Sequence, residues 1–508
     1  MKRSGVTLIA LVITVIVLLI LAGTAIAMGV SGDGLFEKSD KSVKRWNLSE
    51  KNEEIQLYDY FAYVEDITLE AWDGTVGTNF ASGEGTEEFP YIIENGEQLA
   101  YFAKTINEGQ NYANEYISIT KSINLGMHEF TPAGAYLDNH FFNGNLNGNG
   151  NIITGINIDL PETSMIGLIG VLDTNGKISN VKLGNGNING YQFVGGLVAF
   201  NKGTVANCSS SLDVSGKYYS GGVVGENRGS VTNCYNTGNI SSSYSSGGIV
   251  GYLESGSIKG CINNGNVWTK EGNNAGGITA YIQSGEISGC TNNGKIWTTE
   301  GHYTGGISGY IQSGNVSNCN NYGTIIADTS YAGGITGLIA AGTISLCDNN
   351  GEIKTNNNQA GGIVGALRGA SIADCSNNNT VTANNFAGGI VATISIESST
   401  VYNVYNSGSV ISEGNKVAGG IVAAGTKGIL ERAYNKGETT GSITGGIYGA
   451  KTGGTTLNTY YYTLDSNLKG IGSSSTTEKI DVDDVPGQVD KETRLFNSRS
   501  DFLNSVNS

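Results

Sequence analysis

Two tryptophans and two glutamates recur at matching places in the sequence, and together they could bind a sugar. Trp268 and Trp297 each stand seven residues after a cysteine, and Glu271 and Glu300 each follow a tryptophan by three residues. The CH faces of a sugar pack on aromatic rings, while carboxylates accept hydrogen bonds from its hydroxyl groups. We therefore predict an outward-facing ligand-binding surface at these four residues. The alternative is that stacked aromatic side chains only stabilise the strands that carry them.

Three tyrosines form a second candidate surface. They follow Gly-Gly pairs in successive repeats and are Tyr252, Tyr281 and Tyr310. A pair of carboxylates such as Glu271 and Glu300, if held about 5 Å apart, could also serve a retaining glycosidase. That chemistry needs one carboxyl group with a raised pKa, and the sequence shows nothing that would raise it. We therefore predict a protein that is not an enzyme and has no catalytic residues.

The rest of the chain offers little other chemistry. Its three histidines, His128, His140 and His302, lack a metal-ligand spacing, and no phosphate-binding loop ends in Gly-Lys-Ser or Gly-Lys-Thr. A net charge of −16 opposes binding to nucleic acid. We predict no metal, no cofactor and no nucleic-acid partner.

A repeat of 26 to 31 residues positions the candidate residues. Its Gly-Gly pairs begin at positions 195, 221, 247, 276, 305, 333, 361, 388, 419 and 445. Helical repeats would be rich in Leu, Ala and Glu, whereas these contain short Ile- and Val-rich pieces between turns. We predict an all-β fold, a single-stranded right-handed parallel β-helix of about 11–14 coils with one repeat in each coil.

Seven cysteines share one position in successive repeats. They are Cys208, Cys234, Cys261, Cys290, Cys319, Cys347 and Cys375. Val404 and Ala433 take the same position in later repeats, so the slot accepts small apolar side chains and needs no thiol chemistry. We predict a file of buried free thiols. The alternative is disulfide bonds between adjacent coils, which the spacing of stacked strands permits.

Two further columns follow the cysteines. Asparagines stand two positions after six of them and are Asn236, Asn263, Asn292, Asn321, Asn349 and Asn377. Stacked at a turn, their side-chain amides could bond to one another along the stack. Four positions after the cysteines, glycine recurs and is replaced once by Asn379. This substitution pattern predicts a positive φ angle in that column.

The strand after each Gly-Gly pair shows a period of two. In "GGIVGYL", the alternation predicts that Ile249 and Leu253 point inward while Val250 and Tyr252 point outward. The same pattern recurs in "GGITAYI" and "GGISGYI". The tyrosines should therefore form one column on the outer surface.

An uncharged apolar stretch opens the chain. Residues 6–28 are long enough to cross a bilayer, and Lys2 and Arg3 before them favour a cytoplasmic amino terminus. We predict a single-pass transmembrane helix followed by a helical linker over residues 29–66, with the remainder of the chain outside the cell. A cleaved secretory peptide is the alternative, although its apolar part is normally shorter.

The basic residues, Gly5 and the apolar stretch resemble a type IV prepilin. The resemblance implies that residues 1–5 are a leader, that a prepilin peptidase cleaves after Gly5, and that Val6 is methylated. It also implies contact with a pilus assembly machinery. The family usually carries glutamate at the fifth mature position, where this chain has Ala10, so fibre assembly is less supported than membrane insertion. A plain signal anchor is the alternative.

The phrases "GGLV", "GGIVG" and "GGISG", followed by Cys-x-Asn-x-Gly turns, resemble the GLUG repeat of bacterial surface proteins. The resemblance covers roughly residues 72–462 and implies a right-handed β-helix, display on the cell surface and adhesin-like roles. We divide this part into an opening segment with its cap over 67–160, coils over 161–462 and a partly disordered tail over 463–508. A helix over Gln98–Glu108 is expected to cap the first coil.

These observations lead to one main hypothesis and two alternatives. The main hypothesis is a membrane-anchored, pilin-like protein of the cell surface whose β-helix adheres to glycans or to host or matrix surfaces. The first alternative is a minor pilin or stalk whose solenoid is only a spacer without a ligand. The second is a carbohydrate-active enzyme that acts through Glu271 and Glu300.

Overall fold

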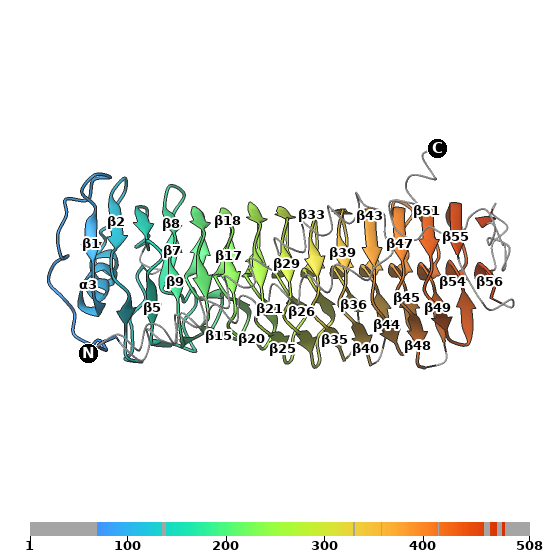
Figure 1. Cartoon of the computed structure of the whole chain (residues 1–508), viewed down its shortest axis with the longest axis horizontal. Coiled ribbons are helices and arrows are strands. Elements are labelled where there is room, and N and C mark those ends of the chain that lie inside the picture. Colours follow the sequence, from blue (N-terminus) through green and yellow to red (C-terminus); the bar gives the residue numbers. More distant parts are fainter. Residues whose placement is uncertain are drawn as a thin grey trace, which may run out of the picture. The chain divides into compact units, whose positions relative to one another are not determined.

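The computed structural model shows a parallel β-solenoid of about 13 turns, which confirms the predicted β-helix (Figure 1). The structure describes residues 69–134, 139–328, 331–356, 358–414, 416–461, 468–474 and 480–482. The predicted leader, transmembrane helix and helical linker, residues 1–66, lie outside these ranges. Within the described ranges, no helix is both long and apolar enough to cross a bilayer.

One coil consists of five short strands joined by turns. The coil that contains the Gly247 pair has β21 (Ser245–Gly247), β22 (Val250–Leu253), β23 (Ser257–Lys259), β24 (Ile262–Asn263) and β25 (Val267–Thr269). The next coil repeats them as β26 (Asn274–Gly276), β27 (Thr279–Ile282), β28 (Glu286–Ser288), β29 (Thr291–Asn292) and β30 (Ile296–Thr298). Each strand pairs in parallel with its counterpart, as where Ile258 lies opposite Ile287.

Within the described ranges, the stacked strands form four sheets of 24, 12, 10 and 11 strands. The 24-stranded sheet contains both β23 and β24, and the other three contain β22, β21 and β25 respectively. In the last coils the two strands of the 24-stranded sheet fuse into one. These fused strands are β43 (Ser371–Asn377), β47 (Thr400–Asn406), β51 (Ile429–Asn435) and β55 (Thr455–Tyr461).

Apolar side chains of the same kind stack in register along the interior. One column, three positions before the cysteines, consists of Val205, Val231, Ile258, Ile287, Val316, Ile344 and Ile372. All of its members are buried. Because burying a Val or Ile side chain stabilises a fold by about 1.5–3 kcal/mol, such columns are the main stabilising element of the solenoid.

The glycine column four positions after the cysteines has a different cause from the predicted one. Gly265, Gly294 and Gly323 all lack a positive φ angle, so that prediction was wrong. A Cβ atom on Gly294 would lie 1.9 Å from the carbonyl oxygen of Gly265, and one on Gly323 would lie 1.9 Å from that of Gly294. The backbone of each coil therefore rests directly on the coil before it, and only hydrogen fits between them.

The left-handed position is instead the residue immediately before each cysteine. It has φ angles from 51° to 64° and is occupied by Asn207, Asn233, Gly260, Gly289, Asn318, Leu346 and Asp374. This conformation turns the chain between the two strands of the 24-stranded sheet. Asparagine, glycine and aspartate adopt it most readily, which explains why they fill most of this column.

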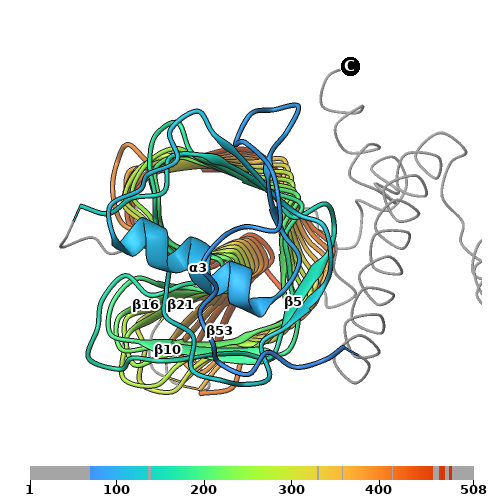
Figure 2. The ribbon, with the colours of Figure 1, turned by 90° about the vertical axis from the view of Figure 1, so that its left-hand side faces the viewer.

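The outward assignment of Val250 was also wrong. Val250 is fully buried in the core with Ile249 and Leu253, whereas Tyr252 lies half-buried on the outer surface as predicted. A Cβ atom on Gly247 would lie 2.0 Å from the carbonyl oxygen of Val250, so the chain folds back tightly here and breaks the alternation. Strands of the 10-stranded sheet, including β16 (Tyr219–Gly221), accordingly run near the middle of the cross-section (Figure 2).

A helix covers the amino-terminal end of the solenoid. Helix α3 (Gly96–Asn107) lies across the first coils, close to the predicted range Gln98–Glu108 (Figure 2). The Asn95 side chain accepts a hydrogen bond from the Gln98 N–H and caps the helix. Its inner face buries Leu99, Phe102 and Ile106 against the solenoid core. The open edge of the first coil is thereby protected from pairing with another chain.

The sheets continue into the segment that was expected to be a loose tail. Strand β56 (Ile471–Ser474) pairs with β54 (Tyr448–Lys451), and β57 (Ile480–Val482) pairs with β55. Sequence similarity to the repeat is lost beyond residue 462, but parallel pairing is not, because backbone hydrogen bonds do not depend on the repeated side chains.

Candidate functional site

The two tryptophans stack on each other as predicted. Trp268 on β25 lies opposite Trp297 on β30, with ring centroids 5.0 Å apart and planes within 8° of parallel. Both side chains are half-buried on the outer surface. The ammonium group of Lys295 lies 5.3 Å from the centre of the Trp297 ring, which adds a cation–π contact. The pair is thus a small aromatic platform on the 11-stranded sheet.

The two glutamates lie in matching turns beside this platform. The N–H of Glu271 donates to the Ser243 carbonyl, and the N–H of Glu300 donates to the Lys270 carbonyl. Both side chains are exposed, and neither forms an ion pair or hydrogen bond with another described residue. The arrangement therefore places two carboxyl groups beside the platform, where their oxygens can accept hydrogen bonds from a ligand.

The three tyrosines form an outward column on the 12-stranded sheet, as predicted. The ring centroids of Tyr252 and Tyr281 are 5.3 Å apart, and those of Tyr281 and Tyr310 are 5.2 Å apart. The Tyr252 and Tyr281 hydroxyls donate to the side-chain oxygens of Gln283 and Gln312 in the following coil. Burial raises the pKa of both hydroxyl groups, so they remain uncharged donors at neutral pH.

Aromatic residues of the neighbouring 10-stranded sheet extend this column at both ends. Tyr219 lies 5.1 Å from Tyr252, and Tyr303 lies 5.3 Å from Tyr310, measured between ring centroids. We call the whole set the aromatic strip: Phe193, Tyr219, Tyr252, Tyr281, Tyr310, Tyr303 and Tyr331. All seven side chains are half-buried. The sequence did not predict the extension, because it joins columns of two different sheets.

Stacking determines what the aromatic strip presents to a ligand. Within the strip, ring faces are largely covered by neighbouring rings, since most pairs are stacked at 5.1–6.1 Å. Ring edges, tyrosine hydroxyls and glutamine amides therefore form most of its outer surface. Such a surface offers hydrogen-bonding groups at the spacing of the coils, on an apolar base.

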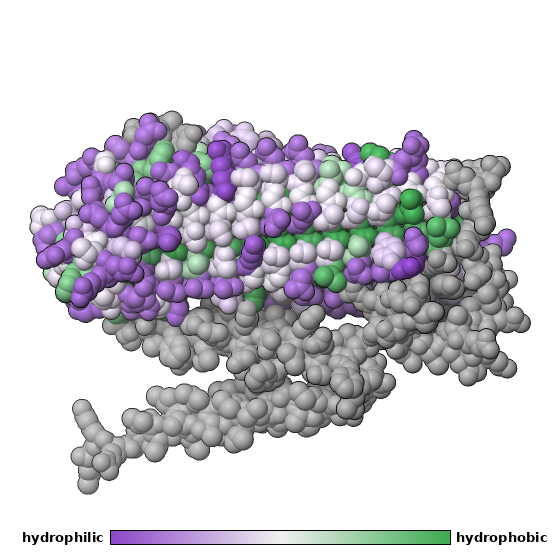
Figure 3. Space-filling model, turned by 90° about the horizontal axis from the view of Figure 1, so that it is seen from above, coloured by the Kyte–Doolittle hydropathy of each residue, from purple (hydrophilic) through white to green (hydrophobic). Residues whose placement is uncertain are grey.

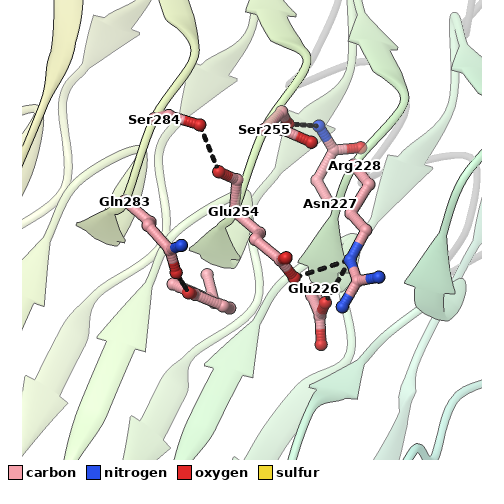
Figure 4. A network of polar contacts seen from close by, with 8 residues as sticks. Glu226, Asn227, Arg228, Glu254, Ser255, Gln283 and Ser284 are labelled. Atoms are coloured by element: carbon pink, nitrogen blue, oxygen red, sulfur yellow. Dashed lines mark hydrogen bonds and ion pairs between the residues drawn. The ribbon is translucent and has the colours of Figure 1, made fainter.

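A buried carboxylate lies at the amino-terminal end of the aromatic strip. Glu226 takes the place in the column that tyrosine takes at position 252, and it is only 3% exposed. The Arg228 Nε donates to the Glu226 Oε1 at 3.0 Å and to the Glu254 Oε2 at 2.6 Å, so both carboxylates meet at one nitrogen (Figure 4). Burial and the hydrogen bond with Glu254 raise the pKa of Glu226 to about 8, against the opposing charge of Arg228.

This cluster was missed by sequence reasoning. The available signal was that Glu226 interrupts an aromatic column, with Arg228 two residues later. The pKa of the Glu226 carboxyl is raised mainly because its burial in this cluster excludes water from it.

The seven cysteines form one file of free thiols inside the solenoid, as predicted. The N–H groups of Cys234 and Cys261 each donate to the sulfur of the next cysteine at 3.4 Å. Each thiol also donates to the carbonyl oxygen two residues before it, at 3.1–3.4 Å. Burial raises the pKa of the Cys347 thiol, which makes a reactive thiolate unfavourable there.

The asparagine column forms the predicted ladder of side-chain amides. From Asn236 to Asn406, each Nδ2 donates to the Oδ1 of the next asparagine at 2.7–2.9 Å. Each also donates to the carbonyl oxygen two residues later, for example from Asn321 to Gly323 at 2.9 Å. The ladder continues through Asn406 to Asn435, which take the same position in the coils of Val404 and Ala433, and its polar groups are almost fully satisfied in a buried turn.

Asn321→Ala is expected to lower the free energy of unfolding by about 2 kcal/mol. The change leaves the Asn292 amide and the Asn349 oxygen without their buried partner, and an unpaired buried group costs about 1–3 kcal/mol. Urea unfolding of the full-length chain measures the effect. Asn320→Ala is the matched control in the same strand, because its side chain points outward; a change above about 0.5 kcal/mol there would contradict the ladder explanation.

Comparison with known proteins agrees with this architecture. Residues 216–241 and 356–382 match the GLUG motif. The "Putative Gly-rich membrane protein" of Evansella cellulosilytica is 36% identical over 135 residues, which are 26% of this chain and 15% of that protein. "Halomucin" of Haloquadratum walsbyi is 34% identical over 144 residues, 27% of this chain and 2% of that protein. The match therefore spans only a small part of either relative.

Among solved structures, a "putative immunoglobulin A1 protease" from Bacteroides ovatus aligns with 58% of this chain and 87% of its own, at 20% identity and a TM-score of 0.41. The fold and the motif matches together define a parallel β-solenoid built from repeated coils. More particularly, two of the stretches that form this solenoid, residues 216–241 and 356–382, match the GLUG motif.

Proposed function

We propose that this chain is a cell-surface protein that binds extended glycan chains along the aromatic strip. The strip is the observation that carries the proposal, because it offers seven half-buried rings in mutual contact across successive coils. A glycan matches it chemically, since sugars combine apolar CH groups with many hydroxyl groups. Tyrosine hydroxyls and the amides of Gln283 and Gln312 are suited to bond to those hydroxyl groups.

The shape of the strip also suits a linear ligand. Tyr252, Tyr281 and Tyr310 follow the stacking direction of the coils, so a polymer lying along them would meet an equivalent group at each step of roughly 4.8 Å. The Trp268–Trp297 platform is a second, shorter surface on another sheet. Glu271 and Glu300 would act there as acceptors.

Binding of the full-length chain, purified in detergent, to a panel of soluble polysaccharides tests the proposal. Tyr281→Ala removes the central ring and is expected to weaken binding at least about tenfold. The double variant Trp268→Ala/Trp297→Ala is the comparison, because it removes aromatic area from the other sheet. Equal affinity in the wild type and Tyr281→Ala, or no saccharide bound at all, would overturn the assignment to the strip.

Surface display in this proposal depends on the amino-terminal segment. Residues 6–28 would anchor the chain in the membrane, and the prepilin-like sequence around Gly5 and Val6 would make it a substrate of a prepilin peptidase. The name of the Evansella relative, a membrane protein, is consistent with such an anchor. Amino-terminal sequencing of protein taken from cells is expected to begin at methylated Val6. A start at Met1 would leave a plain anchor and remove the link to pilus assembly.

A spacer role is the second candidate, favoured by the fact that each coil pairs with the coils immediately before and after it. Deleting residues 276–332 removes two coils and joins Ala275 to Gly333 in register. A spacer would keep its function in this variant, whereas glycan binding along the strip would be lost with Tyr281, Tyr303 and Tyr310.

A further inference from the structure

Two cations lie side by side at the amino-terminal end of the aromatic strip. Asn201 pairs with Asn227 between adjacent coils, so the residues that follow them, Lys202 and Arg228, occupy the same position in successive coils. Both contact the ring of Phe200, with the Lys202 Nζ 5.3 Å and the Arg228 Cζ 4.8 Å from its centre.

The guanidinium group of Arg228 has N–H donors that its two carboxylate partners do not use. Both of its carboxylate partners, Glu226 and Glu254, bond to the single Nε–H (Figure 4). An arginine has four further N–H donors on its two Nη atoms, and these bond to no group among the residues that the structure describes. The side chain is 45% exposed, so this planar fork is accessible to a ligand. Such a fork binds the two oxygens of a carboxylate or sulfate group.

The negative charges around this fork are largely balanced. Lys202 lies 3.5 Å from Asp173, and Arg228 is shared between Glu226 and Glu254. Glu226 is packed among Arg228, Glu254 and the rings of Tyr219 and Tyr252, and its raised pKa keeps it protonated at neutral pH. The protonated Glu226 then adds no negative charge beside the two cations. An anionic ligand is not repelled by a local excess of negative charge.

We propose that Lys202 and Arg228 form an anion-binding subsite at this end of the aromatic strip, which takes the carboxylate or sulfate groups of an acidic polysaccharide. The inference rests on the proposed glycan binding and names the class of glycan. Phe200 holds the two cations in place, the Arg228 fork supplies the paired hydrogen bonds, and the strip binds the saccharide backbone beyond them.

Three polymers with one backbone test the subsite: dextran, carboxymethyl-dextran and dextran sulfate, with the full-length chain in detergent. The wild type is expected to bind the charged polymers at least about tenfold more tightly than dextran, and added salt should weaken that preference. Arg228→Gln should remove most of the preference. Lys354→Gln is the matched control, since it makes the same change in net charge on another sheet and should leave the preference intact.

Comparison of the two charged polymers identifies the anion. Stronger binding of carboxymethyl-dextran assigns the subsite to carboxylates, stronger binding of dextran sulfate assigns it to sulfates, and equal binding supports a general anion subsite. Failure of both to bind better than dextran overturns the subsite, as does an Arg228→Gln variant that keeps the full preference.

The same experiment separates this inference from the proposed function. Suppose that Tyr281→Ala binds all three polymers like the wild type while Arg228→Gln no longer prefers the charged ones. This result would support the anion-binding subsite and contradict glycan binding by the aromatic strip. A pH comparison adds a second check. Near pH 9 the ionised Glu226 should reduce the preference in the wild type, whereas Glu226→Gln should retain it. An equal loss in both proteins would contradict the part assigned to Glu226.

Discussion

Gly294→Ala is expected to lower the free energy of unfolding by about 3 kcal/mol or more, or to prevent the coils around it from forming. The added Cβ atom would lie 1.9 Å from the carbonyl oxygen of Gly265, a backbone atom that cannot rotate away. Overpacking of a core commonly costs about 1–3 kcal/mol when side chains can adjust, and here the coils themselves would have to separate. Urea unfolding followed by circular dichroism measures the loss.

Gly289 provides the control, because glycine is favoured there by a positive φ angle and not by close packing. Gly289 has a φ angle of 64°, and the nearest atom to its added Cβ would be 3.9 Å away, so conformation rather than space restricts it. Gly289→Ala should cost about 1 kcal/mol, and Gly289→Asn should cost little, since asparagine fills this position in other coils. If Gly294→Ala were as mild as Gly289→Ala, close packing would not explain the Gly294 column.

These two glycines show how far sequence reasoning reaches. Register is readable from spacing, so the stacking of cysteines, asparagines, tryptophans and tyrosines was predicted correctly from intervals alone. A column of glycine, however, has two physical causes that leave the same pattern. The choice between a left-handed turn and a close backbone contact depends on where the next coil lies, and the asparagine at position 379 favoured the wrong cause.

The same limit applies to predicting which side chains face the core and which face the outer surface. The period of two correctly placed Tyr252 on the surface but misplaced Val250, because the tight turn after Gly247 shifts the strand relative to the core. Alternation is a property of a straight strand, and it fails where a sheet turns a corner within two residues. The same close approach recurs in the neighbouring coils, where a Cβ atom on Gly221 or Gly276 would lie 2.0 Å from the carbonyl oxygen three residues later.

The candidate site was predictable to the extent that it repeats. The face of the solenoid in Figure 3 is strongly hydrophilic towards its left-hand end and edges and pale along the middle, where a narrow apolar stripe runs along the right-hand coils. Repeated aromatics were visible as columns, but the Glu226 cluster is a single departure from the repeat. Its properties come from Tyr219, Arg228 and Glu254, which approach it from two sheets and two coils. No spacing rule brings those residues together.

Glu226→Gln is expected to change the pH dependence of stability around this cluster. In the folded protein the pKa of Glu226 is raised to about 8, compared with 4.5 for an ordinary glutamate. The folded state therefore holds this proton more tightly than the unfolded state. As the pH rises from 4.5, the unfolded chain releases the proton first, so wild-type stability should fall until the pH passes about 8 and then level off.

Each pKa unit corresponds to about 1.4 kcal/mol, so the full difference amounts to roughly 2–4 kcal/mol once partial access of water is allowed for. The glutamine side chain of the Glu226→Gln variant cannot ionise, so the variant should lose none of this stability as the pH rises. Between pH 4 and pH 9, the free energy of unfolding of the variant should therefore rise relative to that of the wild type. Hydrogen exchange of the amides of β17 (Val224–Asn227) and β22 is the suitable measurement, because coils of a solenoid can open locally.

Glu271→Gln is the matched control, since its exposed side chain has no partner among the described residues. Its exchange profile should run parallel to that of the wild type at every pH. If the exchange profile of Glu226→Gln also ran parallel to that of the wild type between pH 4 and pH 9, the Glu226 carboxyl group would be ionised throughout this pH range. An ionised Glu226 would then add a negative charge beside Arg228, and an acidic ligand at that end of the strip would be electrostatically disfavoured.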